Sequence, residues 1–292
     1  MIVREPVVAG QFYAAEADRC KADVERMLDE ASTDVRWSGS PVAGLVPHAG
    51  WVCSGAVAAQ VFKVLAKTAD AAPDVIVLFG GVHRYRGKDA ALFARGRWET
   101  PLGPVAVDER LAERILGHTN LIVDDPHAHA DEHSIEVQVP FVRHLFPQAK
   151  VVPIMVPISS KAPEVGEAVG RTLSVYKCRA LIVGTTDLTH YGPRYGFSPR
   201  GTDDAAHAWA KEDNDRRFID LVCDMKAAEL VSESLEHRNA CNAGAAAATI
   251  TAAAALGATD GVLLQHTTSR EVLAGKVADL DDSVGYAGVI FV

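Results

Sequence analysis

Short apolar runs rich in β-branched residues alternate with amphipathic segments along this chain of 292 residues. The clearest runs are VIVLFG (75–80), KVVPIMVP (150–157) and ALIVGTT (180–186). Continuous apolar runs of this length are typical of strands that are buried on both faces, and the helical periodicity between them is typical of packed helices. The pattern predicts an α/β fold in which helices flank a central, mostly buried sheet.

Further segments fit the same architecture. Val57, Val61 and Val64 recur at helical spacing after Ser54 and Gly55, which predicts a helix on the sheet. We expect a buried helix in the alanine-rich stretch after Asn242, a final core strand in SVGYAGVIFV at the C-terminus, and a hairpin-like excursion in RWETPLGPVAVD (97–108). No repeat or low-complexity linker interrupts the chain, so residues 1–292 are expected to form a single domain.

Composition excludes several classes of function. The net charge is -9 and no Lys/Arg cluster stands out, so a nucleic-acid partner is not expected. The N-terminus lacks the apolar core of a signal peptide. The longest weakly apolar run, 243–258, is too short to span a bilayer, so we expect no membrane partner and a cytoplasmic protein. Five scattered cysteines without a CxxC motif predict free thiols.

Histidines follow three of the predicted strands. VPHAG places His48 at a strand-to-helix junction, LFGGVHRYRG places His83 after two glycines, and VGTTDLTHYG places Asp187 and His190 after a third strand. Ligands of α/β proteins bind beyond the carboxyl ends of strands. Each histidine alone could be a hydrogen-bonded structural residue, but three such strand ends favour one shared pocket.

Two more segments carry residues able to take part in such a site. His127 and His129 lie in an acidic loop, where a solvated pair and a functional pair are both open. His133 directly precedes an apolar pattern, so we place it in the pocket as a supporting or substrate-facing group. Cys241 precedes the alanine-rich helix, whose N-terminus would favour a thiolate, although spacing alone favours a buried apolar cysteine.

Seven motifs in order give the chain a family resemblance. VAGQFY, VPHAGWVCSG, GGVHRY, WETPLG, DEHSIEVQVPF, TTDLTHYG and CNAG resemble the Memo (MEMO1-like) family, whose bacterial members are also called AmmeMemoRadiSam system protein B. These proteins are similar in fold to LigB-type class III extradiol dioxygenases. Val82 and Asn242 depart from the pattern, since a small or polar residue and a glycine are usual there.

The resemblance implies roles for particular residues. It implies His48 and His83 as metal ligands, Cys241 in the place of a ligating glutamate, and His190 as the acid/base group, with Asp187 and His133 lining the pocket. A thiolate in place of a carboxylate moves the preference toward copper, zinc or thiolate-bound iron. The expected cofactor is therefore a divalent metal, iron or copper first and zinc second.

Three functions remain open from the sequence. The first is a metal-dependent, dioxygenase-like oxidoreductase in which His190 moves protons. The second is a non-catalytic module that uses the pocket to bind a peptide or small molecule. The third is a zinc-dependent hydrolase with His190 or Glu132 as base. The family name also implies a radical-SAM system partner.

Overall fold

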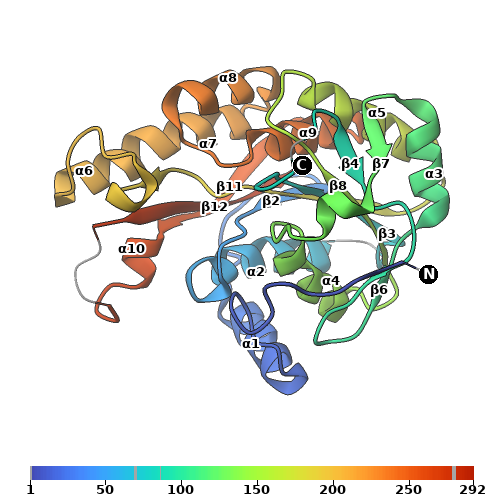
Figure 1. The fold of residues 1–292 in the computed structure, drawn as a ribbon, viewed down its shortest axis with the longest axis horizontal. Coiled ribbons are helices and arrows are strands. Elements are labelled where there is room, and N and C mark those ends of the chain that lie inside the picture. Colours follow the sequence, from blue (N-terminus) through green and yellow to red (C-terminus); the bar gives the residue numbers. More distant parts are fainter. Residues whose placement is uncertain (1, 69–70, 86, 278–280) are drawn as a thin grey trace.

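A mixed nine-stranded sheet forms the centre of the computed structural model, which describes residues 2–68, 71–85, 87–277 and 281–292 (Figure 1). The strands lie in the order β10 (His190–Tyr191), β12 (Ser283–Phe291), β2 (Ala43–Val46), β9 (Ala180–Thr185), β3 (Val75–Gly80), β8 (Lys150–Met155), β4 (Ala90–Leu92) and β7 (Ile122–Asp124), and β11 (Gly261–Thr268) pairs with β12 off this path. The predicted α/β fold is confirmed.

The centre of the sheet is parallel. β2 pairs with β9, β9 with β3, and β3 with β8, all in parallel register. Every residue of β3 is buried, as expected for an apolar run covered on both faces. The predicted strands at 150–157 and 180–186 end slightly earlier, at Met155 and Thr185. Because these strands are parallel, their carboxyl ends meet at one edge of the sheet.

Helices cover both faces of the sheet (Figure 1). One layer contains α1 (Ala17–Glu30), α2 (Trp51–Thr68) and α4 (Val139–Leu145), and α2 contacts β2 and β12. The opposite layer contains α3 (Glu109–His118), α5 (Ala162–Val175), α7 (Arg216–Cys223), α8 (Ala227–His237) and α9 (Ala243–Ala255). The helix predicted after Gly55 is confirmed as α2, and it begins earlier, at Trp51.

The alanine-rich helix α9 is buried between α5 and the sheet. A Cβ built on Gly166 of α5 would come within 2.0 Å of the Ala248 carbonyl oxygen, and one built on Gly184 of β9 would come within 1.8 Å of Thr249 Oγ1. Small residues on both sides therefore allow the backbones to approach closely, which explains why alanine fills this helix.

Both ends of the chain are built into sheets. The predicted excursion at 97–108 is confirmed as a hairpin of β5 (Arg97–Trp98) and β6 (Val105–Ala106), and β1 (Val3–Arg4) pairs with β5 in parallel. The predicted C-terminal strand is confirmed as β12, which is buried along its whole length and pairs with β2, β10 and β11.

None of the helices in the described residues is long and apolar enough to cross a membrane. All five cysteines are free thiols, as predicted.

Candidate metal centre

His48 lies just beyond the end of β2 and is almost completely buried. Its Nε2 lies 3.2 Å from Asn242 Nδ2, an amide whose Oδ1 accepts a hydrogen bond from Val82 N. Nε2 must therefore accept, so Nδ1 carries the proton and donates to Thr185 Oγ1 at 2.8 Å. Burial, aided by the neighbouring imidazoles, holds the pKa of His48 well below its usual value. A neutral imidazole whose Nε2 carries no proton can serve as a metal ligand once the Asn242 amide moves aside.

Glu132 orients His83, which follows β3. Its carboxylate accepts the His83 backbone N–H at 2.8 Å and lies 2.9 Å from His83 Nδ1. It also accepts the backbone N–H groups of His133 and Ser134. Burial alone would lower the pKa of His83, but the Glu132 carboxylate outweighs that effect and the net pKa is raised. With Nδ1 bound to Glu132, Nε2 of His83 is left for another partner.

A second carboxylate fixes the segment that contains Glu132. Arg4 Nη2 donates to the Glu132 carbonyl oxygen at 2.6 Å, and Arg4 Nη1 pairs with Glu136. Glu136 also accepts a hydrogen bond from Tyr13 Oη at 2.9 Å. The N-terminal segment thus ties down η2 (Glu136–Gln138), which explains why the VAGQFY motif accompanies the histidine motifs.

His133 enters the pocket from this anchored segment. Its ring stacks on that of His83, with 4.6 Å between centroids, and lies 5.7 Å from the ring of His48. Ser134 is anchored at the sheet, where its Oγ accepts the Gly81 N–H at 3.1 Å. The predicted apolar anchor is formed by Ile135, which packs against Gly80.

His127 and His129 lie in different environments. His127 is exposed, whereas His129 in η1 (Pro126–His129) is fully buried and its Nε2 donates to the Ala91 carbonyl oxygen at 3.0 Å. His129 packs edge-on against the rings of Phe93 and Trp98. In the structure one residue of the pair is solvated and the other is part of the core, and neither belongs to the histidine cluster.

Cys241 approaches His48 across 193 positions of sequence. Its Sγ lies 3.3 Å from His48 Nε2 and accepts the Asp187 N–H at 3.3 Å. Burial, and then the charge of Asp187, raise the pKa of this thiol. The thiol is therefore protonated in this state, and a metal that binds Sγ must displace that proton.

Asp187 lies on the loop after β9, and His190 begins β10. The Asp187 carboxylate accepts the His48 backbone N–H at 2.8 Å, and burial raises its pKa against the opposing charge of His190. His190 is half-buried and its Nδ1 donates to the Leu188 carbonyl oxygen at 3.0 Å, which leaves Nε2 for another partner. The structure thus brings both residues to the strand ends where His48 and His83 lie.

Among the described residues, the possible metal ligands form two groups that share His48. In one, the ligand atoms of His48, His83 and His133 all lie within 4.8 Å of one another, and in the other so do those of His48, Asp187 and Cys241. The predicted set of His48, His83 and Cys241 spans both groups. Neutral imidazoles, a thiol and a carboxylate are a donor set that suits iron, copper or zinc, so the residues fit a transition metal.

Several residues that hold this site have roles that the motifs do not reveal. Thr185 carried no expected role, Glu132 was expected only as a possible base, and Asn242 and Val82 stood out only as departures from the family pattern. The two departures touch, because Asn242 Oδ1 accepts the Val82 N–H at 3.2 Å. A Cβ on Gly81 would meet the Asn242 side chain at 1.6 Å, so glycine is required beside this amide. In the sequence, the two glycines before His83 were the feature that could have predicted this close contact.

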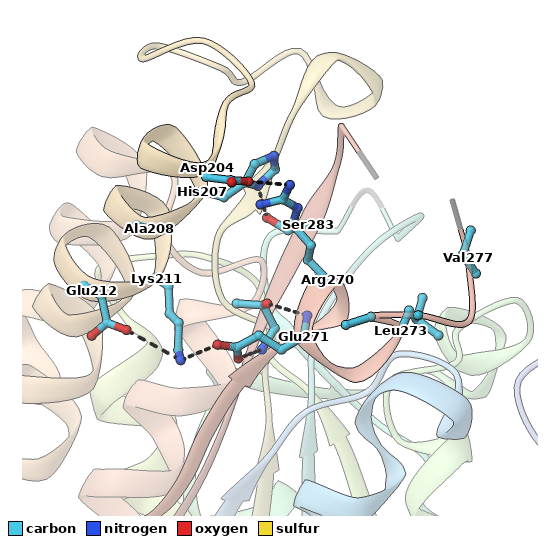
Figure 2. A pocket seen from close by; sticks show the side chains of 13 residues that line it. Asp204, His207, Ala208, Lys211, Glu212, Arg270, Glu271, Leu273, Val277 and Ser283 are labelled. Atoms are coloured by element: carbon cyan, nitrogen blue, oxygen red, sulfur yellow. Dashed lines mark hydrogen bonds and ion pairs between the residues drawn. The ribbon is translucent and has the colours of Figure 1, made fainter. Parts of the chain in front are cut away.

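A separate cavity lies beside α6 (Asp204–Trp209) and α10 (Ser269–Val272), where Thr268 of β11 and Ser283 of β12 line it. It has a volume of about 490 Å³, and Figure 2 shows its charged side chains in pairs. Lys211 Nζ lies 2.6 Å from Glu271, and Arg270 lies 2.8 Å from Asp204. None of the predicted site residues lines this cavity, and its charges are largely neutralised internally.

Comparisons with known proteins agree with the motifs around the histidines. The family described as Memo-like protein matches residues 4–290. A MEMO1 family protein of Pyrobaculum aerophilum is 33% identical over 299 residues, covering 100% of this chain and 99% of its own. One of Pyrococcus furiosus is 34% identical over 304 residues, covering 99% of each.

A solved structure extends the comparison to the fold. An uncharacterized protein of Escherichia coli K12 superposes with a TM-score of 0.52 at 11% identity, covering 85% of this chain and 98% of its own. At that identity the likeness concerns the fold alone. The sequence relatives, by contrast, match from one end of the chain to the other, so this chain belongs to the Memo family.

Proposed function

We propose that this protein is a metal-dependent oxidoreductase of the dioxygenase-like type, with iron or copper at the strand ends. The observation that supports it best is the convergence of imidazole, thiol and carboxylate donors on His48. In this proposal His48 and His83 are ligands and Cys241 supplies the third donor, as the family resemblance implies. When bound, such an ion supplies redox chemistry and open coordination positions for small molecules.

The protein's own residues would position the reactants and move protons. His190 Nε2 is free because Nδ1 is engaged by the Leu188 carbonyl oxygen, so the ring can take a proton from a bound substrate. The positive charge that results at His190 would favour the ionised form of the nearby Asp187 carboxylate, opposing the rise that burial causes in its pKa. Phe12 packs edge-on against His133, with 4.9 Å between centroids, and covers that side of the cluster.

The hydrolase alternative is weakened by the role of Glu132. A general base needs a free lone pair directed at water or substrate. The Glu132 carboxylate accepts four donor groups from residues 83, 133 and 134 and is 3% exposed, so it is committed to holding the site. A zinc hydrolase would then depend on His190 alone as base.

The proposed function also includes the binding partners of the protein and its location in the cell. We infer a small molecule or peptide as the occupant of the pocket, a radical-SAM protein as a partner in the same system, and the cytoplasm as the location. No nucleic acid or membrane is involved in this scheme.

Metal analysis with oxygen uptake tests the proposed function. Protein purified without chelator or a nickel column is expected to contain iron or copper and to consume oxygen with a reductant present. His48→Ala removes the residue that both ligand groups share, so it should lose the metal and the oxygen uptake while remaining folded by circular dichroism. Zinc without oxygen uptake would indicate the hydrolase, and an empty wild-type site would indicate the binding module.

A further inference from the structure

Three imidazoles form a compact cluster at the strand ends. The rings of His83 and His133 are stacked at 23°, and the His48 ring stands nearly perpendicular to both, at 79° and 78°. One ligand atom of each ring lies within 4.8 Å of the others. Three nitrogens this close can move onto a single ion through small side-chain rotations, because Zn–N bonds are about 2.0 to 2.1 Å long.

Each of the three histidines is held by contacts outside the cluster. Thr185 binds Nδ1 of His48, and Glu132 binds Nδ1 of His83. Glu132 also accepts the backbone N–H of His133 at 2.9 Å, while His133 Nδ1 is 3.7 Å from that carboxylate and beyond hydrogen-bond distance. The same buried carboxylate therefore places two of the histidines. Preorganisation of this kind is typical of metal ligands.

The thiol belongs to a different group. Cys241 Sγ lies with His48 and Asp187, and it already accepts the Asp187 N–H. The imidazole group is complete as a three-ligand set without sulfur. Imidazole suits borderline divalent ions, whereas thiolate selects softer ones such as Cu(I).

We propose that His133 completes an all-imidazole site with His48 and His83, which holds a borderline divalent ion without Cys241. This inference rests on the metal site of the proposed function and adds a second way of binding at that site. Cys241 remains the third donor for the iron or copper of the proposed function, and His48 belongs to both ligand sets. The identity of the bound ion would thus decide which side of the pocket supplies the third donor.

Cobalt binding to the whole protein tests this assignment. Co²⁺ is titrated into metal-free wild type, His133→Ala, His133→Gln and Cys241→Ser, with affinity measured by chelator competition and ligation by the near-ultraviolet spectrum. His127→Ala is the matched control, because His127 is an exposed histidine of the same segment. The His133 side chain is 23% exposed, so its replacement leaves the core intact.

The expected result separates His133 from Cys241. Both His133 variants should bind Co²⁺ at least about tenfold more weakly, since loss of even an outer partner of a ligand costs about 10- to 100-fold. Cys241→Ser and His127→Ala should match wild type, whose spectrum should lack a sulfur-to-cobalt charge-transfer band. Wild-type affinity in the His133 variants, or a sulfur band lost together with affinity in Cys241→Ser, would overturn this inference alone. A wild type that binds no ion would overturn it together with the proposed function.

Discussion

His48 is the residue on which the site depends. Its Nε2 faces both Cys241 Sγ at 3.3 Å and Asn242 Nδ2 at 3.2 Å, and its backbone N–H binds Asp187. Asn242 donates to the same lone pair that a metal would use. Binding of an ion to Nε2 must therefore displace this amide, which links metal entry to the CNAG turn.

Replacement of Cys241 should alter metal preference more than metal binding in general. Cys241→Ser should weaken binding of Cu(I) far more than of Mn²⁺, because a hydroxyl is a poor ligand for soft ions. Competition titrations with each ion measure the difference. Cys53→Ser is a suitable control, since Cys53 is partly exposed and outside both ligand groups. An equal loss for both ions would make Cys241 a structural cysteine.

His190 should separate proton transfer from metal binding. His190→Ala should keep near-normal metal content but lose about 10²- to 10⁴-fold in turnover, the usual contribution of a positioned acid/base group. Asp187→Asn should show a milder loss, because the amide retains an acceptor for the His48 N–H but loses the charge. Elemental analysis and oxygen uptake measure the two effects. A His190→Ala protein that purifies without metal would make His190 a ligand.

A π-helical turn at 210–215 holds the segment between β9 and β10, which carries Asp187 and leads into His190. Asp215 Oδ1 accepts the Thr189 N–H at 2.9 Å, and Asn214 Nδ2 donates to Thr189 Oγ1 at 3.0 Å. Asp215 Oδ2 also lies 3.0 Å from His266 Nε2 on β11. A π-turn changes the direction of successive side chains, and such turns occur frequently near functional sites.

Removal of the buried carboxylate in this turn should destabilise the protein. Asp215→Ala leaves the Thr189 N–H and the His266 ring without a partner, and we expect a loss of about 3 kcal/mol in the free energy of unfolding. Urea denaturation measures it. Asp213→Ala is the matched control, since Asp213 is exposed on the same turn and should change stability by less than about 0.5 kcal/mol. Similar losses in both variants would contradict the clamp.

For the molecule as a whole, buried neutral histidines make the free energy of unfolding depend on pH. Burial lowers the pKa of His129 from 6.5 to about 4, and the charge of Arg4 acts in the same direction. Between these two values the unfolded chain binds a proton that the folded protein does not. The stability from this residue is therefore present above pH 6.5 and is lost as the pH falls toward 4.

Replacement of His129 should make the free energy of unfolding depend less on pH. His129→Gln can still donate to the Ala91 carbonyl oxygen but does not titrate, so it should remove a pH-dependent loss of up to about 3 kcal/mol. Urea unfolding of wild type and variant at about pH 7 and about pH 4.5 gives the two slopes. His127→Gln, at the exposed neighbour, should keep the wild-type slope. An unchanged slope in His129→Gln would show that His129 is protonated at similar pH in both states.

Hydrophobic patterning alone predicts the α/β fold, the central strands and the residues at their ends. Apolar runs such as 75–80 admit little besides a strand buried on both faces, and a parallel sheet brings its carboxyl ends to one edge. The strand pattern alone is therefore enough to place His48, His83 and Asp187 together. The family motifs added Cys241, which no spacing rule connects to His48 across 193 residues.

Tertiary structure alone decided which neighbours complete the site. His127 and His129 are two residues apart, yet one is exposed and the other lies in the core, because the short helix η1 turns only one of them inward. Glu132 became an orienting acceptor because the fold brings two donor groups of His83 to it, beside the N–H groups of its neighbours His133 and Ser134. Such roles depend on distances between segments far apart in sequence. Local pattern and periodicity carry no information about those distances. The sequence therefore places His133 in the pocket, but only the packing of its segment shows that its ring lies against those of His48 and His83.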